Sequence, residues 1–148
     1  MATGERLVDP YRNFRFRVEI EDIEIGGFSD VTIPDSSSDV VEYREGTEPP
    51  YVRKLSGLNK YGVLTLKKGI TDSLELYKWR EQIEDTGAKD LRKNISLILI
   101  DEEGAEKSRW EIIEAWCSKI EYSGLSAKGN EVLIETLEIT HERMDRVS

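Results

Sequence analysis

Histidine and cysteine, two side chains that often carry nucleophilic or metal chemistry, occur once each in this sequence, as His141 and Cys117. A structural zinc site needs about four ligands of this kind, and a disulfide needs a second cysteine. A metal site would therefore have to be assembled from carboxylates that the fold alone brings together. We expect no metal and no cofactor, and we expect Cys117 to fill a small core position.

Carboxyl groups are abundant, with 30 Asp and Glu residues in 148. An acid–base pair could be imagined almost anywhere, so their number says nothing about catalysis without geometry. Gly26-Gly27 has no helix directly behind it and is not a phosphate-binding loop. Ser56-Gly57 follows a proline-rich segment and does not match a nucleophile elbow. The sequence predicts that the protein is not an enzyme.

Positive charge is concentrated in one part of the chain. Two interpretations stay open: a docking patch for an acidic neighbour, which could be another copy of this chain, or a solvated loop and strand edge. The whole chain is acidic, with a net charge of −9. It gains nothing from counterion release on nucleic acid and is repelled by anionic membranes, so neither partner is expected for the free subunit. The basic residues are Arg53, Lys54, Lys60, Lys67 and Lys68.

The length of 148 residues fits a single domain, residues 1–148. Apolar runs stay below the roughly 18 residues of a membrane span, and the first residues lack the apolar segment of a signal peptide. We expect the chain to be made and folded in the cytoplasm. Residues 1–10 are polar and are expected to form a flexible arm.

Alternating residues predict strands in the first half of the chain. From Phe14 to Glu21, apolar and charged residues alternate without exception, as in a half-buried strand. Pro34 to Ser38 is a loop by composition. Residues 46–60 contain two prolines and two glycines and are expected to form a long loop, a feature that is often functional. Further strands are expected over residues 28–33, 39–45 and 61–68.

One segment shows helical periodicity. Asp72 and Glu75 form a capping-box pattern at its start, and Gly87 marks its end. The positions expected to pack on a sheet are Leu76, Trp79 and Ile83, with Leu74 and Tyr77 widening the apolar stripe.

The second half of the chain also predicts strands. Residues 95–100 are apolar on both faces, and residues 101–104 form a hairpin turn. Large apolar residues then occupy even positions from Trp110 to Tyr122, which predicts one long strand or a pair with a bend near Ala115. Residues 131–143, which contain His141, are expected to form the last strand.

These elements predict a mainly β fold with one α-helix, an antiparallel β-barrel or sandwich with the helix packed outside. Strands with two apolar faces expose more apolar surface than one helix can cover. Neighbouring subunits are a natural cover for such surfaces.

An ordered series of short segments resembles the phage tail tube protein family, which includes inner tube proteins of contractile injection systems. The similarity covers essentially the whole chain, although Thr32 to Ser38 departs from the segment common in the family. The matching segments are residues 9–20, 26–29, 41–46, 52–58, 64–70, Trp79, Trp110, residues 115–116, 128–131 and 134–138.

The resemblance implies a type VI tube-like subunit that assembles into hexameric rings. The rings would stack into a tube inside a contractile sheath, with baseplate and cap proteins at its ends and protein or DNA cargo in its lumen. The particle would be a phage tail or a released extracellular particle. Residues 46–60 would reach the next ring. Candidate inter-ring or inter-subunit contacts are Glu42, Arg44, Tyr51, Arg53, Lys54 and Lys60.

Three other functions stay open at this point. A tube-initiating or baseplate paralogue of the same fold would form a single ring rather than a tube. A secreted effector carried by such a particle is disfavoured because the chain is one domain. A small β-sandwich hydrolase or lectin-like module is disfavoured because no converging catalytic set is visible.

Overall fold

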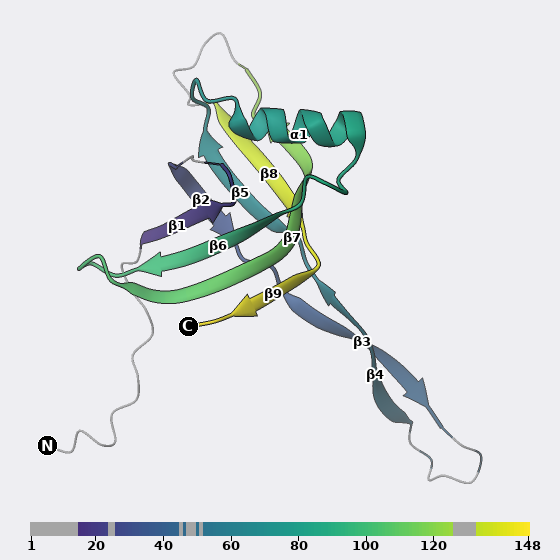
Figure 1. Ribbon diagram of the computed structural model, residues 1–148. Helices are drawn as coiled ribbons and strands as arrows, with labels where there is room; N and C mark the ends of the chain where they lie inside the picture. Colours follow the sequence, from purple (N-terminus) through teal and green to yellow (C-terminus); the bar gives the residue numbers. More distant parts are fainter. Residues whose placement is uncertain (1–14, 24–25, 45, 47–49, 51, 126–132) are drawn as a thin grey trace, which may run out of the picture.

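The computed structural model describes residues 15–23, 26–44, 46, 50, 52–125 and 133–148 (Figure 1). The expected N-terminal arm, residues 1–10, lies outside this part and stays a prediction. The elements are β1 Arg15–Ile20, β2 Phe28–Thr32, β3 Ser36–Tyr43, β4 Arg53–Tyr61, β5 Leu64–Gly69, α1 Glu75–Thr86, β6 Lys93–Ile100, β7 Glu106–Tyr122, β8 Ile134–Thr140 and β9 Arg143–Arg146.

The strands form two sheets, and within each sheet every pair of neighbouring strands is antiparallel. Seven strands form one sheet in the order β1-β6-β7-β8-β5-β2, with β9 also paired to β7. β3 and β4 pair only with each other and extend away from the rest of the molecule (Figure 1). The predicted mainly β, antiparallel class with one helix is confirmed for the described residues.

β7 is the longest strand of the large sheet and pairs with three other strands, and it bends in its middle. Its first half pairs with β6 and β9, and its second half pairs with β8. Glu114 has φ 55°, which lies in the left-handed region and reverses the side-chain alternation. Ile112 is buried before Glu114, whereas Ala115 and Cys117 are buried after it. The predicted bend is therefore correct, but the even-position pattern does not mark one continuous buried face.

The core lies between the two halves of the bent sheet and under α1. Strand β1 contributes Val18 and Ile20, as its alternation predicts, and the centre of the core is completely excluded from solvent. The residues with 0% exposure include Leu64, Leu66, Ile95, Ile112, Leu137 and Ile139.

The helix confirms two predictions and corrects two others. Leu76, Trp79 and Ile83 are buried, and Gly87 ends the helix with φ 84°. Leu74, not Asp72, is the N-cap residue, and no side chain caps the helix. The predicted capping box is therefore wrong, because the helix begins two residues later than Asp72 predicts. Leu74 and Tyr77 are exposed and do not widen the buried stripe.

Three segments differ from the loops and strands that composition predicts. Ser36 to Ser38 belong to β3, and the second part of the predicted 46–60 loop is β4. The expected last strand is divided into β8 and β9 at residues 141–142. The two loop predictions failed because Ser-, Gly- and Lys-containing strands that are exposed on both faces show no alternation.

Candidate assembly surface

β3 and β4 form a two-stranded hairpin that we call the arm. The strands pair from Ser36–Tyr61 at the root to Tyr43–Arg53 at the outer end, with an irregularity between Ser38 and Val40. An isolated two-stranded hairpin is marginally stable in water unless a further element covers one of its faces. The arm therefore has the backbone hydrogen bonds of a sheet, but no other described element packs on its faces to form a hydrophobic core.

The arm exposes large apolar side chains on both faces. Cross-strand neighbours share a face, so Val41 and Leu55 lie on one face, and Val40 lies on the other. Leu58 is 74% exposed and Val40 is 64% exposed. Several exposed large apolar side chains on one projecting element favour a site of interaction with another molecule.

The arm also collects most of the charged residues that the sequence singled out. Glu42 lies directly opposite Lys54, and Arg53 lies opposite Tyr43. Lys60 Nζ lies 3.0 Å from Asp39 Oδ1, and Arg44 follows the end of β3. Tyr51 lies outside the described residues. Four of the six candidate contacts therefore lie on the arm, and Arg44 directly follows it.

The charge on the arm is asymmetric, since β4 contains Arg53, Lys54 and Lys60 and no acidic residue. The whole chain, by contrast, has a net charge of −9. β4 is thus a basic strand on an acidic protein, which suits a partner surface that is itself acidic.

Not all residues of the basic cluster predicted from the sequence lie on the surface, because one of the two lysines in β5 is buried. Lys67 is exposed, but Lys68 points to the core side and is only 1% exposed. Lys68 lies opposite Glu135 of β8, which is 7% exposed. Burial raises the pKa of Glu135, and the nearby Lys68 ammonium opposes that shift. Lys68 is therefore part of the interior and not of a docking patch.

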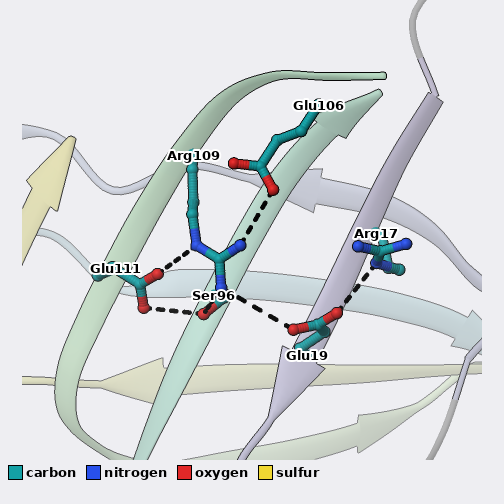
Figure 2. Close-up of polar contacts among 6 residues, drawn as sticks. All are labelled: Arg17, Glu19, Ser96, Glu106, Arg109 and Glu111. Carbon is teal, nitrogen blue, oxygen red and sulfur yellow. Dashed lines mark hydrogen bonds and ion pairs between the residues drawn. The ribbon is translucent and has the colours of Figure 1, made fainter. Parts of the chain in front are cut away.

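A second group of charged residues links three strands on the face of β1, β6 and β7 (Figure 2). Arg109 bonds Glu111 through Nε, and its Nη1 lies 3.0 Å from Glu106 Oε1. Its Nη2 donates to Ser96 Oγ at 3.2 Å, and Ser96 Oγ donates to Glu111 Oε2 at 2.8 Å. Glu19 lies 4.0 Å from the same Nη2.

This Arg109 cluster has the chemistry of a cross-link rather than of a catalytic site. The carboxylates stabilise the guanidinium, so the pKa of Arg109 is raised, chiefly by the hydrogen bond with Glu111. A permanently charged guanidinium cannot exchange protons with a substrate near neutral pH. The cluster cannot be predicted from the sequence because its members come from three strands, and local sequence patterns do not give the register between strands.

Cys117 and His141 show no reactive arrangement. Cys117 is completely buried, and desolvation raises the pKa of its thiol to about 11. In the part of the chain that the structure describes, no group of three or more His, Cys, Asp or Glu residues could hold a metal ion. Among the same residues, no helix combines the length and apolar character needed to cross a membrane.

The fold occurs in solved components of contractile particles. The chain is similar to a chain in the cryo-EM structure of the anti-feeding prophage cap, a tube-terminating cap, with a TM-score of 0.83 and 24% identity over 100% of this chain and 99% of that chain. It is also similar to a chain of the PVC sheath–tube complex of an extracellular contractile injection system, with a TM-score of 0.81 and 24% identity over 94% and 92%.

A more distant similarity is to Hcp1 from Flavobacterium johnsoniae, with a TM-score of 0.57 and 18% identity over 88% of this chain and 93% of that chain. At these identities the likeness establishes the fold alone. No curated protein sequence matches the chain. The family model described as T4-like virus tail tube protein gp19 matches residues 12–145, which is nearly the whole chain. The chain therefore belongs to the T4-like tail tube protein family.

Proposed function

We propose that this protein is the repeating subunit of the inner tube of a contractile phage-like tail or extracellular injection particle. It forms hexameric rings that stack around a channel for cargo, and its role is structural rather than enzymatic. The observation that carries the proposal is the arm, whose apolar side chains are exposed on both faces in the isolated chain. Such an element is completed by assembly.

A second copy of the chain is the partner that fits the arm. β4 brings three basic residues to a chain with a net charge of −9, so the arm of one copy and the acidic surface of another attract each other. Like-charged acidic surfaces without a basic element would repel. In this proposal the arm reaches the next ring, with Arg53 and Lys54 as its main charged contacts.

The ends of the large sheet provide contacts within a ring. Among the described strands, β1 and β2 end the sheet order, so each has one edge without a described neighbour. Unpaired edges invite pairing with another chain, and a closed ring of subunits removes them. Contacts within and between rings are repeated around the tube, so individually weak contacts sum to a stable assembly.

The proposed partners follow from this arrangement. Tubes of this kind lie within a sheath protein and meet baseplate and cap proteins at their ends, and protein or DNA passes through the lumen. Assembly takes place in the cytoplasm, before the particle is released.

The second candidate is a tube-initiating, cap or baseplate paralogue that forms a single ring. The similarity to a chain in the structure of a tube-terminating cap supports this candidate, because that chain comes from the end of a tube. Head-to-tail stacking does not close and continues until a terminator binds. A tube subunit therefore polymerises alone, whereas a terminator stops at a ring.

The test is negative-stain electron microscopy of the purified chain, with light scattering on the same sample. We expect hollow tubes of variable length. Isolated six-fold rings would support the paralogue, and a monodisperse monomer at high concentration would contradict both.

Charge reversal on the arm tests the contact itself. The double variant Arg53→Glu and Lys54→Glu is expected to shorten the tubes or stop assembly at single rings, because the basic strand becomes acidic. The matched control is Lys89→Glu, which reverses an exposed charge beyond α1. Equal tube lengths for the double variant and the parent would refute this role for the arm.

A further inference from the structure

The root of the arm is a break in an otherwise continuous ribbon. β2 pairs with β5, and farther out β3 pairs with β4, but the ladder is interrupted between the pairs Thr32–Thr65 and Ser36–Tyr61. Pro34 lies in the break and has no N–H to donate. One backbone bond crosses the break, from the Gly62 N–H to the Asp35 carbonyl at 3.0 Å. One such bond leaves the direction of the arm poorly fixed.

His141 contacts the break from the segment between β8 and β9. β8 pairs with β5 through Leu64 and Ile139, and His141 lies just beyond the end of β8. Its Nε2 lies 3.0 Å from the Gly62 carbonyl oxygen. Because a carbonyl can only accept, Nε2 carries the proton and donates. The ring also lies beside Tyr61, with the two ring centroids 5.6 Å apart.

Only one of the two imidazole nitrogens makes a hydrogen bond within the described residues. Its other nitrogen, Nδ1, is buried and has no hydrogen-bond partner among the described residues. A buried ring nitrogen without a hydrogen-bond partner costs free energy. One ring nitrogen therefore stays without a hydrogen bond, while the other bonds the backbone of the arm root.

Gly62 is suited to this position because the backbone is approached from two sides. A Cβ at residue 62 would overlap Asp35 Oδ1, so any larger residue displaces the Asp35 side chain. The Gly62 N–H donates to the Asp35 backbone carbonyl and the Gly62 carbonyl faces His141 Nε2, so both backbone groups of this residue are engaged at the arm root.

The length of the arm makes the angle at its root important. A strand of eight residues such as β3 is about 26 Å long at about 3.3 Å per residue. A change of about 10° at the root therefore moves the outer end by about 5 Å, close to the spacing between neighbouring strands of about 4.8 Å. Such a displacement takes the arm from one contact on a partner to the next.

We propose that His141 is a positioning residue that fixes the direction of the arm through the Gly62 carbonyl. The inference rests on the proposed function, in which the arm must meet a second copy in one orientation. His141 makes no contact with that copy in this scheme. It acts through the backbone of the arm root and presets the geometry before assembly.

The test measures the arm direction in unassembled subunits by pulsed electron paramagnetic resonance. Spin labels are attached at Leu58→Cys on the arm and Lys89→Cys beyond α1, two exposed positions. Cys117 is completely buried and is not labelled in the folded chain. The sample is diluted until light scattering shows no assembly, so the distance distribution reports a single subunit.

We expect a narrow distance distribution for the parent and at least a twofold broader one for His141→Ala. His141→Gln keeps an N–H donor and is expected to restore most of the parent's narrow width. Gly62→Ala keeps His141 but displaces Asp35, and we expect it to shift the mean distance. Circular dichroism melting checks that each variant folds. If His141→Ala fails to fold, His141→Phe takes its place: it keeps a ring beside Tyr61 but has no N–H donor, so we expect the same broadening, and a width equal to the parent's overturns the proposal.

A distribution for His141→Ala as narrow as the parent's overturns the proposal. So does equal broadening in the Ala and Gln variants, because the hydrogen bond would then not be what fixes the direction. The measurement does not depend on assembly. A narrow, His141-dependent distribution in a chain that never forms tubes would refute the proposed function and leave the positioning role intact.

Discussion

The hairpin formed by β6 and β7 and the arm formed by β3 and β4 have the same antiparallel ladder in opposite environments. In the first, Ile95 and Ile112 are completely buried against the rest of the core. In the second, every residue of β4 except Tyr61 is exposed, and Leu58 is 74% exposed. The difference between the two lies in what covers them, not in the backbone hydrogen bonds.

This contrast indicates where the stability of the chain resides. Burial of apolar surface is the main favourable contribution to folding, and the arm buries very little in the isolated chain. The body should therefore fold and melt almost independently of the arm side chains. The arm side chains should instead control association, where their apolar surface is removed from water.

The largest effect on stability is expected in the body, at Trp79. Its ring is 2% exposed and its Nε1–H donates to the Leu91 carbonyl at 2.8 Å. Trp79→Ala leaves a cavity and an unpaired carbonyl, so we expect the free energy of unfolding to fall by about 3–5 kcal/mol. Urea denaturation followed by circular dichroism measures this change. Tyr77→Ala is the matched control, since Tyr77 is 46% exposed on the same helix.

A smaller effect is expected at Arg109, which connects Glu106, Glu111 and Ser96 (Figure 2). Arg109→Ala leaves carboxylates close together without their cation, and we expect a loss of about 1 kcal/mol at low salt. The loss should shrink in 1 M NaCl, where charges are screened. Arg143→Ala, in an exposed pair with Asp145, should change little. Equal losses for the two variants would show that the Arg109 cluster does not act as a network.

The stabilising contribution of Asp101, in the turn of the β6–β7 hairpin, should depend on pH. The Ala105 N–H bonds Asp101 Oδ1, and this bond is the main cause of the lowered pKa of Asp101. A lowered folded pKa stabilises the fold above the unfolded value of about 3.8, and this contribution is lost as pH falls through the folded pKa.

The variant Asp101→Asn should therefore be less stable than the parent near neutral pH, and the difference should disappear at strong acid. Unfolding free energies measured between pH 2 and pH 7 check this. A difference that stays constant over that range would show that the charge of Asp101 is not involved.

The smallest effect on unfolding is expected on the arm. Leu58→Ser removes an exposed side chain, so the free energy of unfolding should change by less than about 0.5 kcal/mol, while tubes become shorter or absent. Thiol reactivity of the buried Cys117 provides a second readout, because it reports opening of the core. Faster Cys117 labelling in Leu58→Ser would show that the arm packs on the body in the free chain, and this would remove the contrast between the two regions.

Local sequence signals were reliable where one face of an element is covered. The alternation in β1, the stripe of Leu76, Trp79 and Ile83 in α1, and the turn after β6 were all predicted. β4 was mistaken for a loop because both of its faces are exposed and its residues do not alternate. The capping box at Asp72 also failed, since a four-residue pattern does not show where the helix begins.

The candidate contacts could be predicted in part. The concentration of Arg53, Lys54 and Lys60 is visible in the sequence, and the structure places all three on one projecting strand. Lys68 belongs to the same run of basic residues but is buried opposite Glu135. Side-chain direction depends on strand register, which a list of charges does not contain.

The sequence alone determined the class of the protein: a mainly β fold with one helix in the described residues, an acidic chain and the ordered segments of the tail tube family. These properties follow from composition, periodicity and local motifs. Only the tertiary structure decided that the arm is a hairpin, that Arg109 links three strands, and that His141 holds Gly62 from 79 positions away. Such contacts arise from strand pairing over long sequence separations, and short-range patterns do not encode them.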